Sequence, residues 1–158
     1  QNYHFESKEA LWRAAVDHLF DRLDSLLASH ASASADDSPR DRLAAMIRSL
    51  VHAAAELPEL NRIMVREATA ASERLTWIVD RHTRPRFEVL TADWRRLRDA
   101  GDVPDIDDVV VYYSLVGAAS LPYVNAPEAR LLGHDTLDER FIDAHADALV
   151  GLFLGGPT

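Results

Sequence analysis

Residues 105–123 read DIDDVVVYYSLVGAASLPY, and this stretch decides the fold class because it could form either a strand or a helix. β-Branched residues dominate the start of its apolar run, as they do in buried strands. The aspartates before that run instead make a good helix N-terminus, and Gly117–Ser120 continues the stretch with small residues that suit helix packing. A helix that is buried on every side therefore fits better than a strand.

The segments on both sides of this stretch carry apolar residues at the spacing of helices. Ser7 is expected to cap a first helix that frays at Ser29. Ser38, Pro39 and Asp41 make the start signal of a second helix, with a cap, a first-turn proline and an acid at the third position. The expected helices are residues 7–29, 39–56, a third from 58, 72–100 with a break or kink near Pro85, 106–123, 127–132 and 137–154.

The fold is therefore expected to be all-α, a single bundle of about six helices without an internal repeat. A chain of 158 residues, 47 % of them hydrophobic, is long enough for one domain with a real core. Because there is no cysteine, disulfides and thiolate metal sites are excluded. No window approaches the roughly 18 apolar residues of a membrane span, and no signal segment opens the chain. We expect a cytoplasmic protein that does not enter a membrane.

The charge balance also bears on partners. A formal net charge of -9 at pH 7 repels a phosphate backbone. The chain as given is therefore expected to bind DNA weakly or not at all by itself.

The most specific motif is residues 2–11, NYHFESKEAL. It resembles the end of the helix-turn-helix of TetR-family transcriptional regulators, where an aromatic–His–Phe run closes the recognition helix and a Ser-Lys-Glu-x-Leu run opens the next helix. The matching residues are Tyr3, His4, Phe5, Ser7, Lys8, Glu9 and Leu11. The alternative interpretation is a hydrophobic staple made of ordinary core aromatics.

The resemblance implies that Tyr3 and His4 contact DNA phosphates in the intact protein, with the charge of Lys8 beside them. It divides the chain into residues 1–6, a remnant of the DNA-binding helix-turn-helix, and residues 7–158, a ligand-sensing and dimerisation domain. Such a head needs roughly 40 further residues upstream. Operator DNA would therefore be bound only through a head that this sequence lacks.

The resemblance also implies a homodimer formed by the last two long helices, here 107–123 and 137–154. Both are apolar over more of their circumference than one small core needs, and a four-helix contact with a second copy would bury the excess. The expected interface residues are Val116, Ala119, Phe141, His145, Ala148, Leu149 and Leu152.

A ligand pocket is expected among the central helices, for a small apolar or amphipathic molecule. The candidates are polar or large residues on the apolar stripes, and of Arg66 and Glu67 at most one can face inward. They are His52, Met64, Arg66, Glu67, Trp77, His82, Trp94, Tyr112, Tyr113 and Asn125. The histidines show no metal-ligand spacing, so neither a metal nor a cofactor is expected.

These expectations favour a TetR-like regulator, a repressor, in which a small molecule controls DNA binding. One alternative is a helical interaction module with no link to DNA. Another is a small all-α enzyme, for which Ser114 or Ser120 with His145 would be the only imaginable dyad. The sequence has no nucleophile elbow and no phosphate-binding glycine loop, so no catalytic residue is expected.

Overall fold

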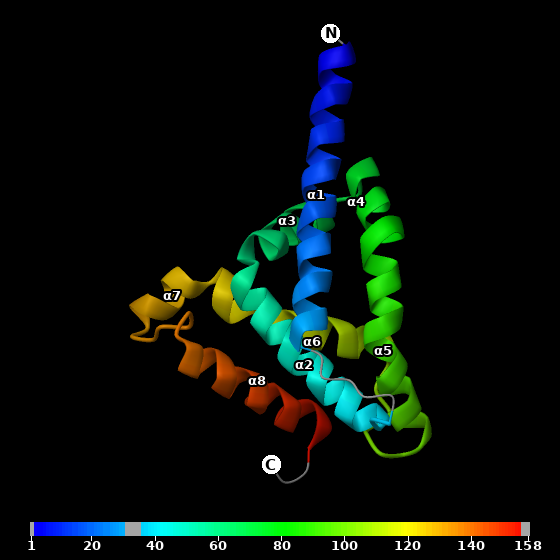
Figure 1. Cartoon of the computed structure of the whole chain (residues 1–158), viewed down its shortest axis with the longest axis vertical. Helices are drawn as coiled ribbons and strands as arrows, with labels where there is room; N and C mark the ends of the chain where they lie inside the picture. The colour runs from blue at the N-terminus through cyan, green and yellow to red at the C-terminus, as the bar shows by residue number, and fades with distance from the viewer. Residues whose placement is uncertain (1, 31–35, 156–158) are drawn as a thin grey trace.

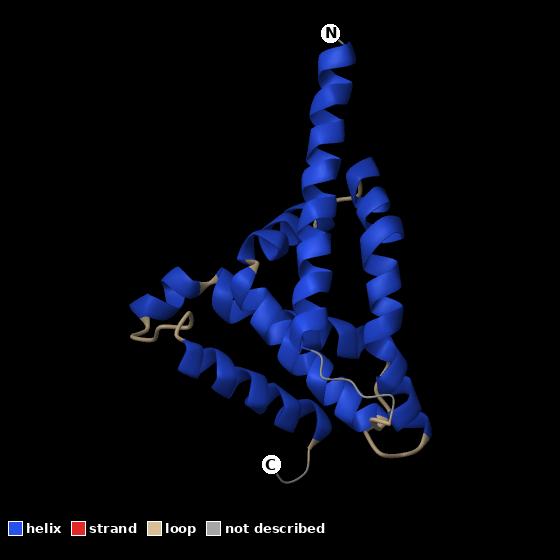
Figure 2. Cartoon of the chain, in the orientation of Figure 1, coloured by secondary structure: helices blue, strands red, loops and turns tan. Residues whose placement is uncertain are grey.

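The computed structural model describes residues 2–30 and 36–155, and within them every regular element is a helix (Figure 2). The elements are α1 (Asn2–His30), α2 (Pro39–Glu56), α3 (Pro58–Ala68), α4 (Glu73–Ile78), the π-helix η1 (Val79–Thr83), α5 (Arg84–Asp99), α6 (Asp108–Val124), α7 (Ala126–Leu131) and α8 (Glu139–Leu154). The all-α prediction is confirmed, and the stretch that could have been a strand is helix α6. Since α4, η1 and α5 are continuous, the described part of the chain has seven helical segments, and each corresponds to one of the helices expected from the sequence.

Side-chain caps explain most of the helix starts. Ser38 accepts a hydrogen bond from the backbone N–H of Asp41 and precedes the first-turn proline, as its motif predicts. Ser72 caps α4, Asp107 caps α6 and Asp138 caps α8 in the same way. These boundaries are confirmed because the caps act within a few residues of sequence.

The break or kink predicted near Pro85 is present as the π-helix η1, which ends just before this proline. Proline has no N–H and its ring clashes with the carbonyl of the preceding turn, so an ordinary α register cannot run through it undisturbed. The backbone N–H of Arg84 bonds instead to the carbonyl of Val79, five residues back. The long helix therefore continues, with a widened turn before the proline.

The expected N-cap at Ser7 is wrong. Helix α1 begins at Asn2 and passes through Ser7 without a break. Residues 2–11 contain neither proline nor glycine, and the capping preference of serine, about 1 kcal/mol, does not end a helix that can propagate.

Figure 1 shows α1 standing upright with α4, η1 and α5 running alongside it in the same direction. Helix α2 crosses the middle of the molecule, with α8 packed along it and α6 behind it. Helices α6 and α8 run in opposite directions, joined by α7 at one end.

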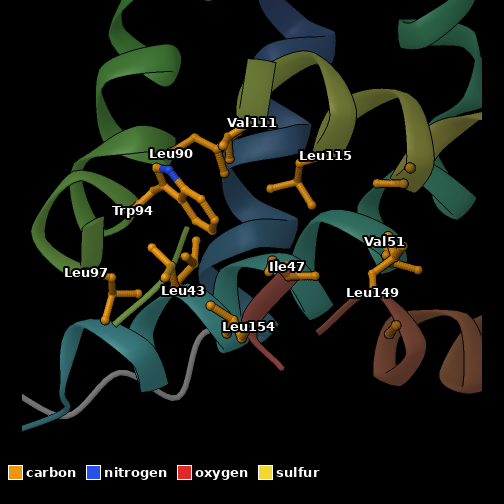
Figure 3. Close-up of a cluster of buried hydrophobic side chains, with 14 of the residues drawn as sticks. Leu43, Ile47, Val51, Leu90, Trp94, Leu97, Val111, Leu115, Leu149 and Leu154 are labelled. Carbon is orange, nitrogen blue, oxygen red and sulfur yellow. The ribbon is translucent and has the colours of Figure 1, made fainter. Parts of the chain in front are cut away.

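The buried apolar side chains form two separate clusters. The main cluster joins α2, α5, α6 and α8, and Figure 3 shows Trp94, Ile47 and Leu115 among its members. The smaller cluster joins α1 to the start of α3 and to α4, through Val16, Phe20 and Ile78 with Leu57 and Leu60. Helix α1 therefore has a core of its own, beside the main one.

The sequence predicts that helix α6 is buried on every side, and this prediction is wrong. Val110, Tyr113 and Leu121 are among its exposed residues, while Val111 and Leu115 are buried. The apolar residues of α6 thus form two faces of the helix. The other helices of this chain cover one of these faces and leave the second exposed. No helix in the described ranges is both long and apolar enough to cross a lipid bilayer.

Candidate functional site at the junction of α1 and η1

Helix α1 is attached to α4, η1 and α5 by a row of ion pairs. Three acidic residues on α1 each face an arginine on the neighbouring long helix. The shortest N–O distances are 2.8 Å for Glu9–Arg74, 2.7 Å for Asp17–Arg81 and 2.7 Å for Asp24–Arg86. Because these pairs are partly exposed, each contributes only about 0.2–1 kcal/mol. Their regular order fixes how α1 is aligned with its neighbour.

The middle of this row contains a buried histidine. The ring of His82 is stacked on Phe20 at 4.1 Å between centroids, and its Nε2 lies 2.6 Å from Oδ1 of Asp17. Its Nδ1 faces the guanidinium of Arg86 at 3.4 Å. Since a guanidinium only donates, Nδ1 is the accepting nitrogen and Nε2–H donates to the carboxylate. This arrangement needs a neutral His82.

Electrostatics supports the same assignment. The Arg81 guanidinium holds the pKa of Asp17 below its ordinary value, although partial burial opposes it. Burial lowers the pKa of His82, and the charges of Arg86 and Arg81 lower it further, outweighing the hydrogen bond to Asp17. A buried neutral imidazole between a carboxylate and guanidinium groups is thus the stable state at neutral pH.

The π-helix leaves one hydroxyl without a partner. Several other helical Thr and Ser side chains bond back to the carbonyl four residues earlier, as Thr91 does to Phe87 at 2.8 Å. The corresponding carbonyl for Thr83 is that of Val79, which already accepts the N–H of Arg84 in the π register. Oγ1 of Thr83 is buried and has no hydrogen-bond partner among the described residues. Such an orphan group marks a strained or functional position.

Aromatic rings surround the junction. Trp12 and Trp77 lie 5.9 Å apart between centroids, and Arg74 and Arg13 stack on their faces. On the side of α6, Tyr112 packs edge-on against Phe87, and burial raises the pKa of Tyr112. The junction thus combines apolar rings with a few polar groups, the composition typical of small-molecule sites in helical proteins.

A second candidate surface lies on α6 and α8. Its exposed residues form one stripe on each helix, with Val110, Tyr113, Gly117 and Leu121 on α6. On α8 the stripe is Ala144, Ala148 and Leu152, and Leu152 is 79 % exposed. We call this surface the α6–α8 face. A hollow of about 240 Å³ opens on it where α5, α6 and the end of α8 meet.

Comparison with known families decides the classification. Residues 39–157 match the family described as HTH-type transcriptional dual regulator CecR, C-terminal domain. The chain belongs to this family. It is accordingly the C-terminal domain of a TetR-type regulator, as its fold and its opening motif had suggested. A comparison with curated proteins finds no match.

The residues that match the CecR C-terminal family begin at Pro39, where α2 begins. Helix α1 therefore precedes the matched residues, and the junction described above joins it to the family's domain. In the described parts of the chain, no three His, Asp or Glu side chains are placed to hold a metal ion.

The predicted pocket residues of this CecR-type domain are distributed over several places. Trp77 and His82 lie together at the junction, and Met64 packs against the same small cluster. Trp94 is in the main cluster, where its indole N–H donates to the carbonyl of Ile106. The structure therefore groups only part of the predicted set.

The remaining pocket candidates lie elsewhere, except Tyr112, which borders the junction from the side of α6. Glu67 is the more buried of the adjacent pair and faces Arg74, whereas Arg66 is exposed. His52 faces Asp143 across α2 and α8 at 3.4 Å, and Asn125 ends α6. Tyr112 is half-buried next to the exposed Tyr113.

Most of the predicted dimer residues are turned toward the chain's own core. Ala119 and Leu149 are buried in the main cluster, with Val116 and Phe141 partly buried against it. His145 bonds to Tyr123 at 2.6 Å and to the carbonyl of Ala118 at 2.9 Å. Ala148 and Leu152 are exposed on the α6–α8 face. Of the seven predicted residues, five are thus covered at least in part by the chain's own core, because spacing alone does not say which of two apolar faces is covered.

Of the expected DNA contacts, Lys8 is exposed on α1. The side chains of Tyr3 and His4 lie outside the described residues. Sequence reasoning missed Asp17, Arg81, Arg86 and Thr83, which make the junction. The available signal was the recurrence of acids at positions 9, 17 and 24 on one helix and of arginines at 74, 81 and 86 on another.

Proposed function

We propose that this chain contains the ligand-sensing and dimer-forming part of a TetR-type repressor, in which residues 1–6 belong to the DNA-binding head and residues 7–158 form the sensor. A small apolar or amphipathic molecule binds in the helical body and shifts α1. Because α1 leads toward the head, its movement changes the spacing of two heads relative to operator half-sites about one helical turn apart. No catalytic step is part of this proposal.

One observation carries the proposal: α1 crosses α2, but its buried apolar side chains belong to the smaller cluster, and partly exposed ion pairs attach it to α4, η1 and α5. An element held in this way can change position while the main core stays intact. The hydrogen bond between His82 and Asp17 is where a change in the body would reach α1.

The proposed ligand site is the junction itself. Trp77 and Tyr112 offer apolar surface, and the unpartnered hydroxyl of Thr83 offers a hydrogen bond. Two of the three tryptophans of the chain, Trp12 and Trp77, lie here. Binding of 1-anilinonaphthalene-8-sulfonate, an amphipathic aromatic probe, should therefore be saturable and should quench their fluorescence.

A pair of variants makes the probe experiment specific. Tyr112→Ala should weaken binding of the probe, while Tyr113→Ala, the exposed neighbour, should leave it unchanged. Equal binding by both variants would remove the junction as the ligand site. The Trp12→Phe variant identifies which tryptophan reports.

The proposed dimer contact is the α6–α8 face, whose apolar stripes would be buried by a second copy related by a twofold axis. Leu152→Glu should convert the dimer to a monomer in sedimentation velocity, because it places a charge in the middle of that contact. Val89→Glu, at an exposed valine of α5, is the matched control and should leave the dimer unchanged. A wild-type chain that sediments as a monomer would contradict the proposed dimer.

A further inference from the structure

The loop side of the α6–α8 hairpin carries two adjacent leucines that are strongly exposed. Leu131 is 90 % exposed and Leu132 is 72 % exposed, both at the end of α7. Leaving two adjacent leucines in water forgoes roughly 1.5–3 kcal/mol for each side chain that could be buried. We call this pair the α7 tip.

The α7 tip is held firmly in place. Gly133 has a positive φ of 89°, and its N–H and that of His134 bond back to the carbonyls of Arg130 and Ala129. Thr136 is buried and donates from Oγ1 to the carbonyl of Pro122 on α6 at 2.7 Å. The two leucines are thus presented by an ordered cap, which reduces the entropy cost of inserting them elsewhere.

The opposite end of the α6–α8 hairpin carries the hollow. Its walls come from α5, α6, α8 and the loop between α5 and α6, and they are mostly apolar, with Ser114 as a polar member. They include Trp94, Pro104, Ile106, Val110, Leu152 and Phe153. At about 240 Å³ the hollow is smaller than the usual small-molecule pocket of about 300–1,000 Å³. Its size and apolar lining suit an inserted aliphatic side chain.

The position of these two features suggests their partner. Figure 1 shows α7 at one end of the α6–α8 hairpin, while the end of α5, the start of α6 and the end of α8 lie at the other. A twofold axis that crosses α6 and α8 at right angles, near the middle of the α6–α8 face, exchanges the two ends of the hairpin. It therefore brings the α7 tip of each copy to the hollow of the other, and both contacts close at once.

We infer that the α7 tip of one protomer inserts into the hollow between α5, α6 and α8 of a second copy of this chain. The occupant is a second copy because one chain carries both the leucines and the hollow, and because Val110 and Leu152 belong both to the hollow and to the α6–α8 face. This inference rests on the proposed dimer and adds a reciprocal contact at its edges.

Directed disulfide formation tests the contact, and the chain suits it because it has no cysteine. Two single variants, Ile106→Cys and Leu131→Cys, are mixed and oxidised mildly. The mixed disulfide is expected as the main covalent product, ahead of the product from either variant alone. The control mixture pairs Ile106→Cys with Leu11→Cys, at an exposed leucine of α1, and should cross-link far less.

A second measurement uses the strength of the dimer. The double variant Leu131→Asp/Leu132→Asp should raise the dimer dissociation constant by about 10- to 100-fold, as loss of a well-packed contact does. Both substitutions lie at exposed positions, so the fold should be kept, and circular dichroism checks this.

The outcomes separate the inference from the dimer itself. If wild type sediments as a dimer but the mixed disulfide is no more abundant than the control product, the inference is overturned while the dimer stands. If the double variant has the same dimer dissociation constant as wild type, the inference is likewise overturned while the dimer stands. If wild type is a monomer, both the proposed dimer and this contact fail.

Discussion

His82 Nε2 lies 2.6 Å from Asp17 Oδ1, and this hydrogen bond joins the π-helix of the body to the middle of α1. Both residues also interact with arginines, Asp17 with Arg81 and His82 with Arg86. The junction is thus a small charge network between α1 and the continuous helix of α4, η1 and α5, which contributes residues to both clusters.

Removing the charge of Asp17 should loosen α1. Asp17→Asn should lower the free energy of unfolding by about 1–2 kcal/mol, because His82 and Arg81 lose a charged acceptor that is only partly exposed. Glu6→Gln, at an exposed acid on the same helix, is the control and should stay within about 0.5 kcal/mol of wild type. Urea unfolding measures both. Equal effects of the two variants would remove the special role of Asp17.

Acid should weaken the fold in the range where histidines titrate. Burial lowers the pKa of both His82 and His145. These two side chains therefore bind protons less readily in the folded chain than in the unfolded chain. Their contribution is complete above the ordinary histidine value of about 6.5 and is lost as the pH falls below it through the lowered values. The free energy of unfolding should therefore decrease as the pH is lowered from about 7 to about 5.

Substitution identifies the groups responsible for that slope. His82→Gln and His145→Gln should each flatten it, with His18→Gln, at an exposed position of α1, as the control. A slope that His82→Gln does not change would mean that His82 binds a proton in the folded state as easily as in the unfolded one.

Replacing Thr83 and replacing Thr91 by valine should have opposite effects on stability, because only the hydroxyl of Thr91 has hydrogen-bond partners among the described residues. Thr83→Val should be neutral or stabilising by up to about 1 kcal/mol, because it removes a buried group that has no partner. Thr91→Val should destabilise by about 1 kcal/mol, because Oγ1 of Thr91 donates to the carbonyl of Phe87 and accepts from Arg95. Thermal unfolding compares them. A clear loss of stability in Thr83→Val would show that its hydroxyl is satisfied.

Gly117 lies inside α6 on the exposed face, and an added Cβ would meet no atom of this chain within 4 Å. Gly117→Ala should therefore stabilise the monomer by about 0.5–1 kcal/mol through helix propensity. The same methyl should weaken the dimer if two copies approach closely there. Unfolding measured at several protein concentrations separates these effects, and a tighter dimer would contradict close approach at Gly117.

Most helix boundaries, though not the one expected at Ser7, could be predicted because their causes are local. Ser38, Asp107 and Asp138 cap helices a few residues away, and Pro85 disturbs the turn directly before it. The choice of helix for residues 105–123 also succeeded, since it rested on an acidic start and on small residues within the stretch.

The arrangement of the sites could not be predicted in the same way. Leu149 and Leu152 lie on the same apolar helix, yet one is buried in the core and the other is exposed. Spacing reveals a wide apolar surface but not which part of it the chain covers. The partners of His82 are equally invisible, because Asp17 lies 65 residues away and meets it only through tertiary packing.

The most direct test of the account is native-state hydrogen exchange of the whole chain, with and without Asp17→Asn. We predict that amides of α1 exchange through an opening of lower free energy than those of α2, α6 and α8, since α1 belongs to the smaller cluster. Asp17→Asn should speed exchange in α1 and leave the main-core helices unchanged. If all four helices exchange with one free energy and the variant lowers it equally in each, α1 is part of a single rigid unit and cannot carry the signal as proposed.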